Sequence, residues 1–169
     1  MAKIEKPLEL LTAELRRLLY VEQQLAESVI PQLLSESNHS ELKQGVTLHL
    51  QQTRGHVTNL ERAFELVDAE AKAEKSPAFD GLVDEHARSA GKTKQPRLLD
   101  LVHADAVAKT EHLEIAAYET LVQLAEDMDQ NELAALLREN LEDEQKALDD
   151  VKKALADLTR QAAALAGTR

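Results

Sequence analysis

The chain has no cysteine and no tryptophan, and its 169 residues include only two Phe, two Tyr, five Gly and four Pro. Without cysteine, neither a disulfide framework nor a thiolate metal site or nucleophile is possible. The scarcity of glycine and proline leaves few turn residues from which to build a β-architecture. Because aromatic residues are rare, leucine and alanine must supply most of the buried surface, and these residues favour helices.

Positive charge is also in short supply. The 20 Lys and Arg residues stand against 31 Asp and Glu residues, which gives a formal net charge of −11. Because binding to phosphate backbones requires clustered Lys and Arg, we expect no nucleic-acid partner and no anionic membrane partner. No apolar run approaches the roughly 20 residues that cross a bilayer, and the first residues lack the apolar core of a signal peptide. The expected location is the cytoplasm.

Apolar residues recur at a spacing of three and four over four long segments, which predicts four helices. The expected helices cover about 7–34, 40–69, 96–126 and 131–165. Between about 70 and 95 the pattern weakens, and Pro77, Gly81 and Gly91 interrupt it. A short helix is expected within this segment, at about 79–87.

The lengths of the connections predict how these helices pack. Short connections make the first two helices antiparallel neighbours, and likewise the last two, whereas the long middle segment must cross the bundle. Two helical hairpins joined in this way form an all-α, ferritin-like four-helix bundle, here as a single domain over residues 1–169. A bundle with a disordered middle loop is the alternative.

A few residues within the expected helices carry their own expectations. Pro31 cannot donate to residue 27 and should bend the end of the first helix. Gly55 suggests the close approach of another backbone, and simple relief of crowding is the alternative. His39, His86 and His103 are expected in loops or on the surface.

Each expected helix carries polar side chains on its apolar face near mid-length. They are Glu22 in the first helix, His49, Thr53 and His56 in the second, Glu111 and the adjacent-turn Glu114 in the third, and Asn140 and Glu144 in the fourth. Counted from the two hairpin loops, Glu22 lies level with Thr53, and Glu114 lies level with Glu144. The four helices are therefore expected to bring these side chains towards one interior zone.

Carboxylates clustered in a core must be protonated, paired or neutralised by cations, because an isolated buried charge costs several kcal/mol. Carboxylates and imidazoles on facing helices are what a pair of iron or manganese ions requires, with bridging Glu oxygens and terminal His nitrogens. The candidate metal ligands are Glu22, His49, His56, Glu111, Glu114 and Glu144.

Each candidate also has a simpler interpretation. A single Glu on such a face is more often half-exposed at a helix edge, and His49 and His56 could equally be hydrogen-bonded core histidines. Since His112 is turned about 100° from Glu111, a supporting or surface position fits it better. Tyr118 is expected to pack in the core with its hydroxyl hydrogen-bonded, and a radical or redox role is the alternative.

Four segments of the expected helices carry a specific sequence pattern: LRRLLYVEQQL at 15–25, HLQQTRGHVTNLERAFE at 49–65, EHLEIAAYETL at 111–121 and LLRENLEDEQKALDD at 136–150. These segments resemble the signature helices of the YciE/YciF ferritin-like stress proteins. The resemblance covers roughly residues 8–160. It implies a dimeric ferritin-like protein associated with general stress responses, with the six candidate ligands matching the positions of a di-metal centre.

The chain departs from that family pattern at three positions. Gln51 and Gln52 stand where relatives commonly have a Glu, and Leu148 stands where they often have an acidic residue. The second and fourth helices also lack the Glu-x-x-His pair of typical di-iron proteins. Loss of carboxylates lowers the affinity for hard cations. The two functions left open are a di-metal protein that reacts with oxygen or peroxide during stress, and a metal-free structural or interaction protein.

Overall fold

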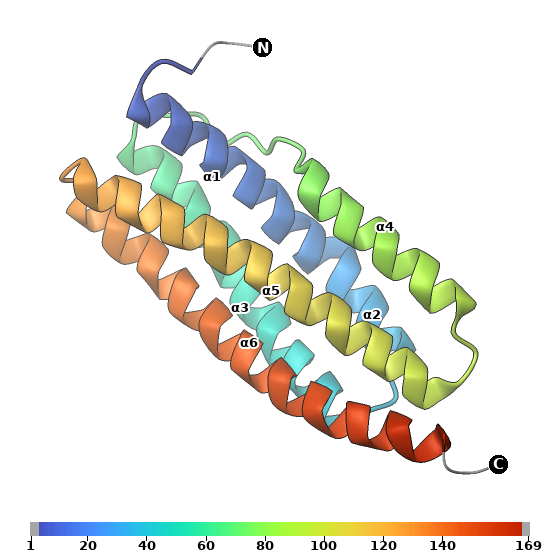
Figure 1. Ribbon diagram of the computed structural model, residues 1–169. Helices are drawn as coiled ribbons and strands as arrows, with labels where there is room; N and C mark the ends of the chain where they lie inside the picture. Colours follow the sequence, from blue (N-terminus) through green and yellow to red (C-terminus); the bar gives the residue numbers. More distant parts are fainter. Residues whose placement is uncertain (1–3, 167–169) are drawn as a thin grey trace.

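The computed structural model describes residues 4–166, and every regular element in that range is a helix (Figure 1). The helices are α1 (Pro7–Gln24), η1 (Leu25–Val29, a π-helix), α2 (Ile30–Glu36), α3 (Ser40–Leu66), α4 (Pro77–Lys92), α5 (Pro96–Asp127) and α6 (Asn131–Ala166). The predicted boundaries therefore hold to within a few residues, except that the first helix is interrupted and the short middle helix is longer than 79–87.

Four helical columns form the bundle. The first column is α1, η1 and α2 in succession, and the others are α3, α5 and α6 (Figure 1). The α1 helix packs against α3 and α5, and α6 packs against the same two helices, so the four columns enclose one core. The predicted all-α four-helix bundle, built from two antiparallel hairpins, is confirmed.

The segment between the two hairpins contains the helix α4, whereas the alternative was a disordered loop. Its helix α4 lies outside the bundle and packs along α5 (Figure 1). Tyr20 of α1 holds α4 in place, since its hydroxyl donates to Asp80 at 2.7 Å and its ring meets the ring of Phe79 edge-on at 6.3 Å. Ahead of α4, the Glu74 amide donates to the carbonyl of Arg16 at 3.0 Å.

The first column contains a π-turn in place of the simple bend expected near Pro31. Residues Leu25–Val29 form a π-helix, and the Ile30 amide donates to the carbonyl of Leu25. Proline has no amide hydrogen, and its ring clashes with the carbonyl four residues earlier. The widened turn just before Pro31 accommodates the ring and lets the column continue to Glu36.

Two residues beyond the end of α3 and of α5 stands an aspartate in the left-handed region, Asp68 at φ 52° and Asp129 at φ 58°. The amide after each aspartate reaches back to the helix: Ala69 donates to Phe64 at 3.0 Å and Gln130 donates to Ala125 at 2.8 Å. This pattern is a Schellman motif, which glycine usually terminates because it has no Cβ. Both α3 and α5 therefore terminate without the glycine that usually marks such a helix end in a sequence.

The apolar core consists of two clusters, one towards each end of the bundle. One cluster includes Leu15, Phe64 and Leu137, and the other includes Ile30, Leu42 and Val151. The middle of the bundle between them is where buried polar side chains gather. Gly55 does not mark a close backbone contact, because a Cβ added there would meet nothing within 4 Å; that prediction is wrong.

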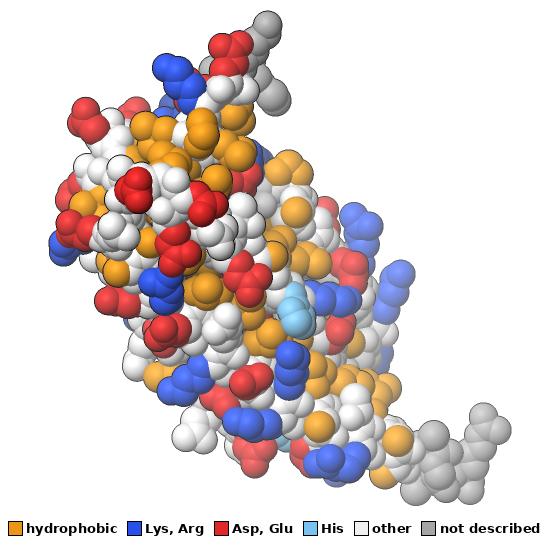
Figure 2. Space-filling model, turned by 60° about the vertical axis from the view of Figure 1, so that its left-hand side comes forward, with side chains coloured by type: hydrophobic (Ala, Val, Ile, Leu, Met, Phe, Trp, Pro, Cys, Tyr) orange, Lys and Arg blue, Asp and Glu red, His pale blue; other side chains and the backbone are white. Residues whose placement is uncertain are grey.

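The surface carries charges of both signs. On the face shown in Figure 2, Asp and Glu side chains are interspersed with Lys and Arg. Among the described residues, no helix combines the length and the apolar character that a membrane span requires.

Replacing Asp129 with glycine should raise the free energy of unfolding by up to about 1 kcal/mol, since glycine adopts a left-handed backbone without a Cβ clash. Urea denaturation followed by circular dichroism measures the change. The matched control is Asp149→Gly at an exposed position inside α6, where glycine should lower stability by a few tenths of a kcal/mol. Equal losses in both variants would contradict the left-handed assignment.

Candidate metal centre

The structure brings the six candidate ligands together between the two apolar clusters. Their exposed fractions are 0% for Glu22, Glu114 and Glu144, 1% for Glu111, 2% for His56 and 5% for His49. None is half-exposed at a helix edge. Local helix geometry explains the convergence, since side chains three, four or seven residues apart share one helix face.

These side chains form two adjoining groups. In the first, one ligand atom each from His49, Glu111, Glu114 and Glu144 lies within 4.8 Å of the others. His49 Nε2 is 3.3 Å from Glu111 Oε1, and His49 Nδ1 is 3.7 Å from Glu144 Oε2. This group draws on α3, α5 and α6.

The second group consists of Glu22, His56 and Glu144, again with ligand atoms within 4.8 Å of one another. His56 Nδ1 lies 2.9 Å from Glu144 Oε1 and 3.3 Å from Glu22 Oε1. Glu144 belongs to both groups, so its two oxygens face two different sets of donors. A carboxylate placed in this way is suited to lie between two cations.

The oxygen and nitrogen atoms of the candidate ligands make few hydrogen bonds within the protein. Among the described residues, the buried ligand atoms that make no hydrogen bond are Glu22 Oε2, His49 Nδ1, both ring nitrogens of His56, Glu111 Oε2, and both oxygens of Glu114 and of Glu144. The short distance from His56 to Glu144 is thus a charge contact without hydrogen-bond alignment. Unsatisfied buried oxygens and nitrogens are costly unless something else binds them. This buried His/Glu cluster could hold metal ions.

Burial and mutual repulsion set the protonation of the carboxylates in the absence of metal. Burial, and then the charge of Glu144, hold the pKa values of Glu111 and Glu114 well above the ordinary value of a glutamate. Burial also raises the pKa of Glu22, to about 7. Without cations, the site therefore retains protons near neutral pH.

The two histidines respond in opposite directions. Burial lowers the pKa of His49. Burial also opposes a charge on His56, but the neighbouring carboxylates of Glu144 and Glu22 outweigh it and raise the pKa of His56 to about 10. Contact with His56 in turn lowers the pKa of Glu144 despite its burial. His56 is therefore a cation held between two carboxylates, and His49 is neutral.

Three consecutive hydrogen bonds hold the Glu22 carboxylate in position. The Tyr118 hydroxyl donates to Glu22 Oε1 at 2.6 Å, Asn140 donates to the Tyr118 hydroxyl at 2.9 Å, and Asn59 donates to Asn140 at 2.7 Å. Tyr118 is fully buried. Its hydroxyl is satisfied as expected, but its partner is a candidate ligand, so Tyr118 helps to orient the site as well as to fill the core. Periodicity marked Asn140 as an anomaly, whereas partly buried Asn59 gave no signal.

Asp143 is a further residue that the sequence did not single out. Its Oδ2 lies 3.5 Å from His56 Nε2, and its Oδ1 accepts from the Gln52 side chain at 2.8 Å. Gln52 thus holds a carboxylate beside His56, whereas Gln51 is exposed and Leu148 belongs to the apolar core. The three departures from the family pattern lie outside the two ligand groups.

The remaining histidines divide between surface and interior. His112 is exposed, as expected, and His39 caps α3 by accepting from the Leu42 amide. The expectation for His103 is wrong, because it is 0% exposed and lies 2.8 Å from His86 across the α4–α5 contact. The helix α4 covers this face of α5, which the periodicity of α5 alone could not reveal.

Known proteins are similar to this chain in fold and in sequence. A family described as a domain of unknown function, DUF892, matches residues 6–164. Protein YciF of Escherichia coli strain K12 is 34% identical over 132 residues, which are 76% of each chain. The crystal structure of the E. coli stress protein YciF superposes with a TM-score of 0.86 at 25% identity, over 93% of this chain and 99% of that one. YcfI of Rhodopseudomonas palustris, described as a candidate structural protein, gives 0.86 at 29% identity over 89% and 95%.

In metal-free protein, the free energy of unfolding should fall as the pH rises from about 4.5 to 7, because an unfolded Glu releases its proton near pH 4.3 while the folded site retains protons. The variant Glu114→Gln keeps a neutral side chain at every pH and should be more stable than the wild type at pH 7. Its advantage should shrink towards pH 4. Urea denaturation at a series of pH values tests this, with exposed Glu142→Gln as the control. Parallel curves for wild type and Glu114→Gln would refute it.

Proposed function

Because this chain belongs to the DUF892 family and is a homologue of the E. coli stress protein YciF, we propose that it is a di-metal stress protein. The metal ions are iron or manganese, held in the middle of the bundle. The reaction involves oxygen or peroxide under stress. The observation that carries the proposal is the pair of buried ligand groups that share Glu144.

The composition of the donor set supports iron or manganese. It combines four carboxylates with two imidazoles and no sulfur, and such oxygen-rich sites suit these cations. The unpaired donor oxygens supply a further reason, since a bound cation would satisfy atoms that otherwise lose hydrogen bonds on burial. Two divalent ions would also offset the negative charge that four ionised glutamates bring into the core.

Each residue has a distinct proposed role. Glu144 would be shared by the two ions, His49, Glu111 and Glu114 would hold one of them, and Glu22 and His56 would hold the other. Tyr118 and Asn140 keep the Glu22 carboxylate in position. The apolar clusters on both sides lower the local dielectric constant, which raises the strength of the charge interactions. Bound iron or manganese would supply the capacity for one-electron chemistry with oxygen or peroxide.

A metal-free structural or interaction protein is the second candidate. The observation that favours it is the charged contact of His56 with Glu22 and Glu144, which joins α1, α3 and α6 without any cation. Together with the Tyr118 hydrogen bonds, it could fix the register of the bundle. The description of the relative YcfI agrees with this candidate.

We further propose that the chain forms a homodimer, as its resemblance to the YciE/YciF proteins implies. The described surface exposes large apolar side chains at Leu8, Leu10 and Leu98, which lie outside the groove between α3 and α6. Light scattering coupled to size-exclusion chromatography should give twice the chain mass of 18.7 kDa. A mass equal to one chain would contradict the dimer.

Metal content should distinguish the two candidate functions. Protein loaded anaerobically with ferrous or manganous ions, then desalted, should retain about two ions per wild-type chain by plasma mass spectrometry. Glu144→Gln should lose most of both ions, because it removes the shared carboxylate. Glu114→Gln and Glu22→Gln should each retain about one ion, since each touches a single group.

Exposed Glu142→Gln is the matched control and should load like the wild type. Circular dichroism should show that each variant is folded, so that a lower metal content cannot be attributed to unfolding. Metal far below one ion per chain in the wild type would sink the di-metal proposal and leave the metal-free protein. Full loading of Glu144→Gln would overturn the role of the shared carboxylate.

A further inference from the structure

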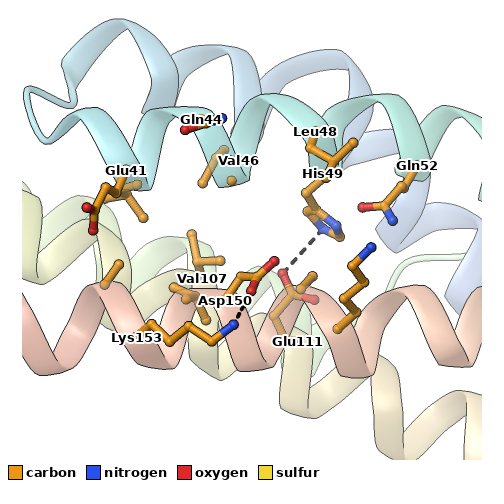
Figure 3. A pocket seen from close by; sticks show the side chains of 16 residues that line it. Glu41, Gln44, Val46, Leu48, His49, Gln52, Val107, Glu111, Asp150 and Lys153 are labelled. Carbon is orange, nitrogen blue, oxygen red and sulfur yellow. Dashed lines mark hydrogen bonds and ion pairs between the residues drawn. The ribbon is translucent and has the colours of Figure 1, made fainter.

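A groove on the surface between α3 and α6 leads to the candidate metal centre (Figure 3). Its volume is about 460 Å³, which lies within the range of roughly 300–1,000 Å³ that is usual for small-molecule sites. One water molecule occupies only about 30 Å³ of liquid. The groove is therefore larger than water, oxygen or hydrogen peroxide needs for access.

The inner end of the groove is formed by His49 and Glu111, whose side chains point towards each other in Figure 3. Both residues also belong to the first ligand group. A molecule lying in the groove could therefore place one end against that group while the rest remained between the helices. No member of the second group lines the groove. A molecule in the groove therefore reaches the candidate metal centre from the side of the first ligand group only.

The wall of the groove is apolar, and its rim carries equal numbers of acidic and basic side chains. Leu42, Val46, Val107 and Val151 form its wall. The rim carries two acidic residues, Glu41 of α3 and Asp150 of α6, and two basic residues of α6, Lys146 and Lys153. Lys153 donates to Asp150 at 2.7 Å. An apolar wall cannot stabilise a charged group, and a rim of equal opposite charges attracts neither sign.

From these features we propose that the groove binds a neutral aliphatic molecule with a terminal hydroxyl or hydroperoxyl group, seated with that end at His49 and Glu111. The inference rests on the proposed function and names its substrate class: an organic hydroperoxide rather than hydrogen peroxide alone. The aliphatic chain packs on the valine and leucine wall, and the polar end meets the donor atoms of the first ligand group.

Gly45 provides the test, because it lines the groove and a Cβ added there meets nothing within 4 Å. A leucine at this position would extend into the groove. Gly55 lies on the same helix, is exposed, lies outside the groove and is equally free of neighbours. Gly45→Leu and Gly55→Leu both replace a helical glycine by a better helix former, so both variants should fold.

The probe is octan-1-ol, titrated into metal-free protein and followed by the chemical shifts of the Val46, Val107 and Val151 methyl groups. Wild type and Gly55→Leu should show saturable shifts, and Gly45→Leu should bind at least about tenfold more weakly. Octanoate and octylammonium, of equal chain length but opposite charge, should both bind more weakly than octan-1-ol. The use of metal-free protein separates this test from the metal-content experiment.

Four results would overturn the inference. The first is the absence of saturable shifts at these valines in the wild type, and the second is equal binding by both leucine variants. The third is a change of oligomeric state in Gly45→Leu by light scattering, which would indicate that a second copy of the chain covers the groove. Tighter binding of either charged probe would also overturn the assignment of a neutral ligand.

Discussion

Four carboxylates and two imidazoles buried at mid-bundle are the constraint on which the rest of the structure depends. Removing so many ionisable groups from water costs several kcal/mol for each unpaired charge, so the bundle is stable only if protons, partner charges or cations neutralise them. The two apolar clusters on either side supply the burial that offsets this cost. Each of the four helical columns contributes at least one of the six groups, so neither hairpin can assemble the centre alone.

The protein can meet this constraint in two ways, and they compete for the same atoms. In metal-free protein, protons remain on Glu111 and Glu114, and His56 carries a positive charge between Glu22 and Glu144. Cations would replace those protons, as expected for ligands that must deprotonate to bind. A bundle whose buried charges are neutralised by protons without metal, and by cations if they bind, would keep its fold in both states. The di-metal and structural interpretations of the same side chains are therefore compatible.

The sequence predicted what depends on periodicity along one helix. The four helices, their pairing and the six clustered side chains all follow from spacings of three, four and seven residues. Features that depend on contacts between helices were not predictable in this way. The burial of His103 requires α4 to cover α5. The support of Glu22 by Tyr118, Asn140 and Asn59 joins four helices, α1, α3, α5 and α6. The left-handed backbone at Asp68 and Asp129 was also not predictable, because both positions carry aspartate where glycine would be the signal.

The positions that departed from the family pattern illustrate the difference between charge in the sequence and charge at the site. Counted along the chain, Gln51, Gln52 and Leu148 suggest a centre that has lost carboxylates. In the structure, Gln51 is exposed, Leu148 packs in the apolar core, and Gln52 holds Asp143 within 3.5 Å of His56. An amide at position 52 therefore retains a carboxylate near the site by hydrogen bonding, although it provides none itself. The six converging side chains that could hold metal are all present, because none of the three departures removes one of them.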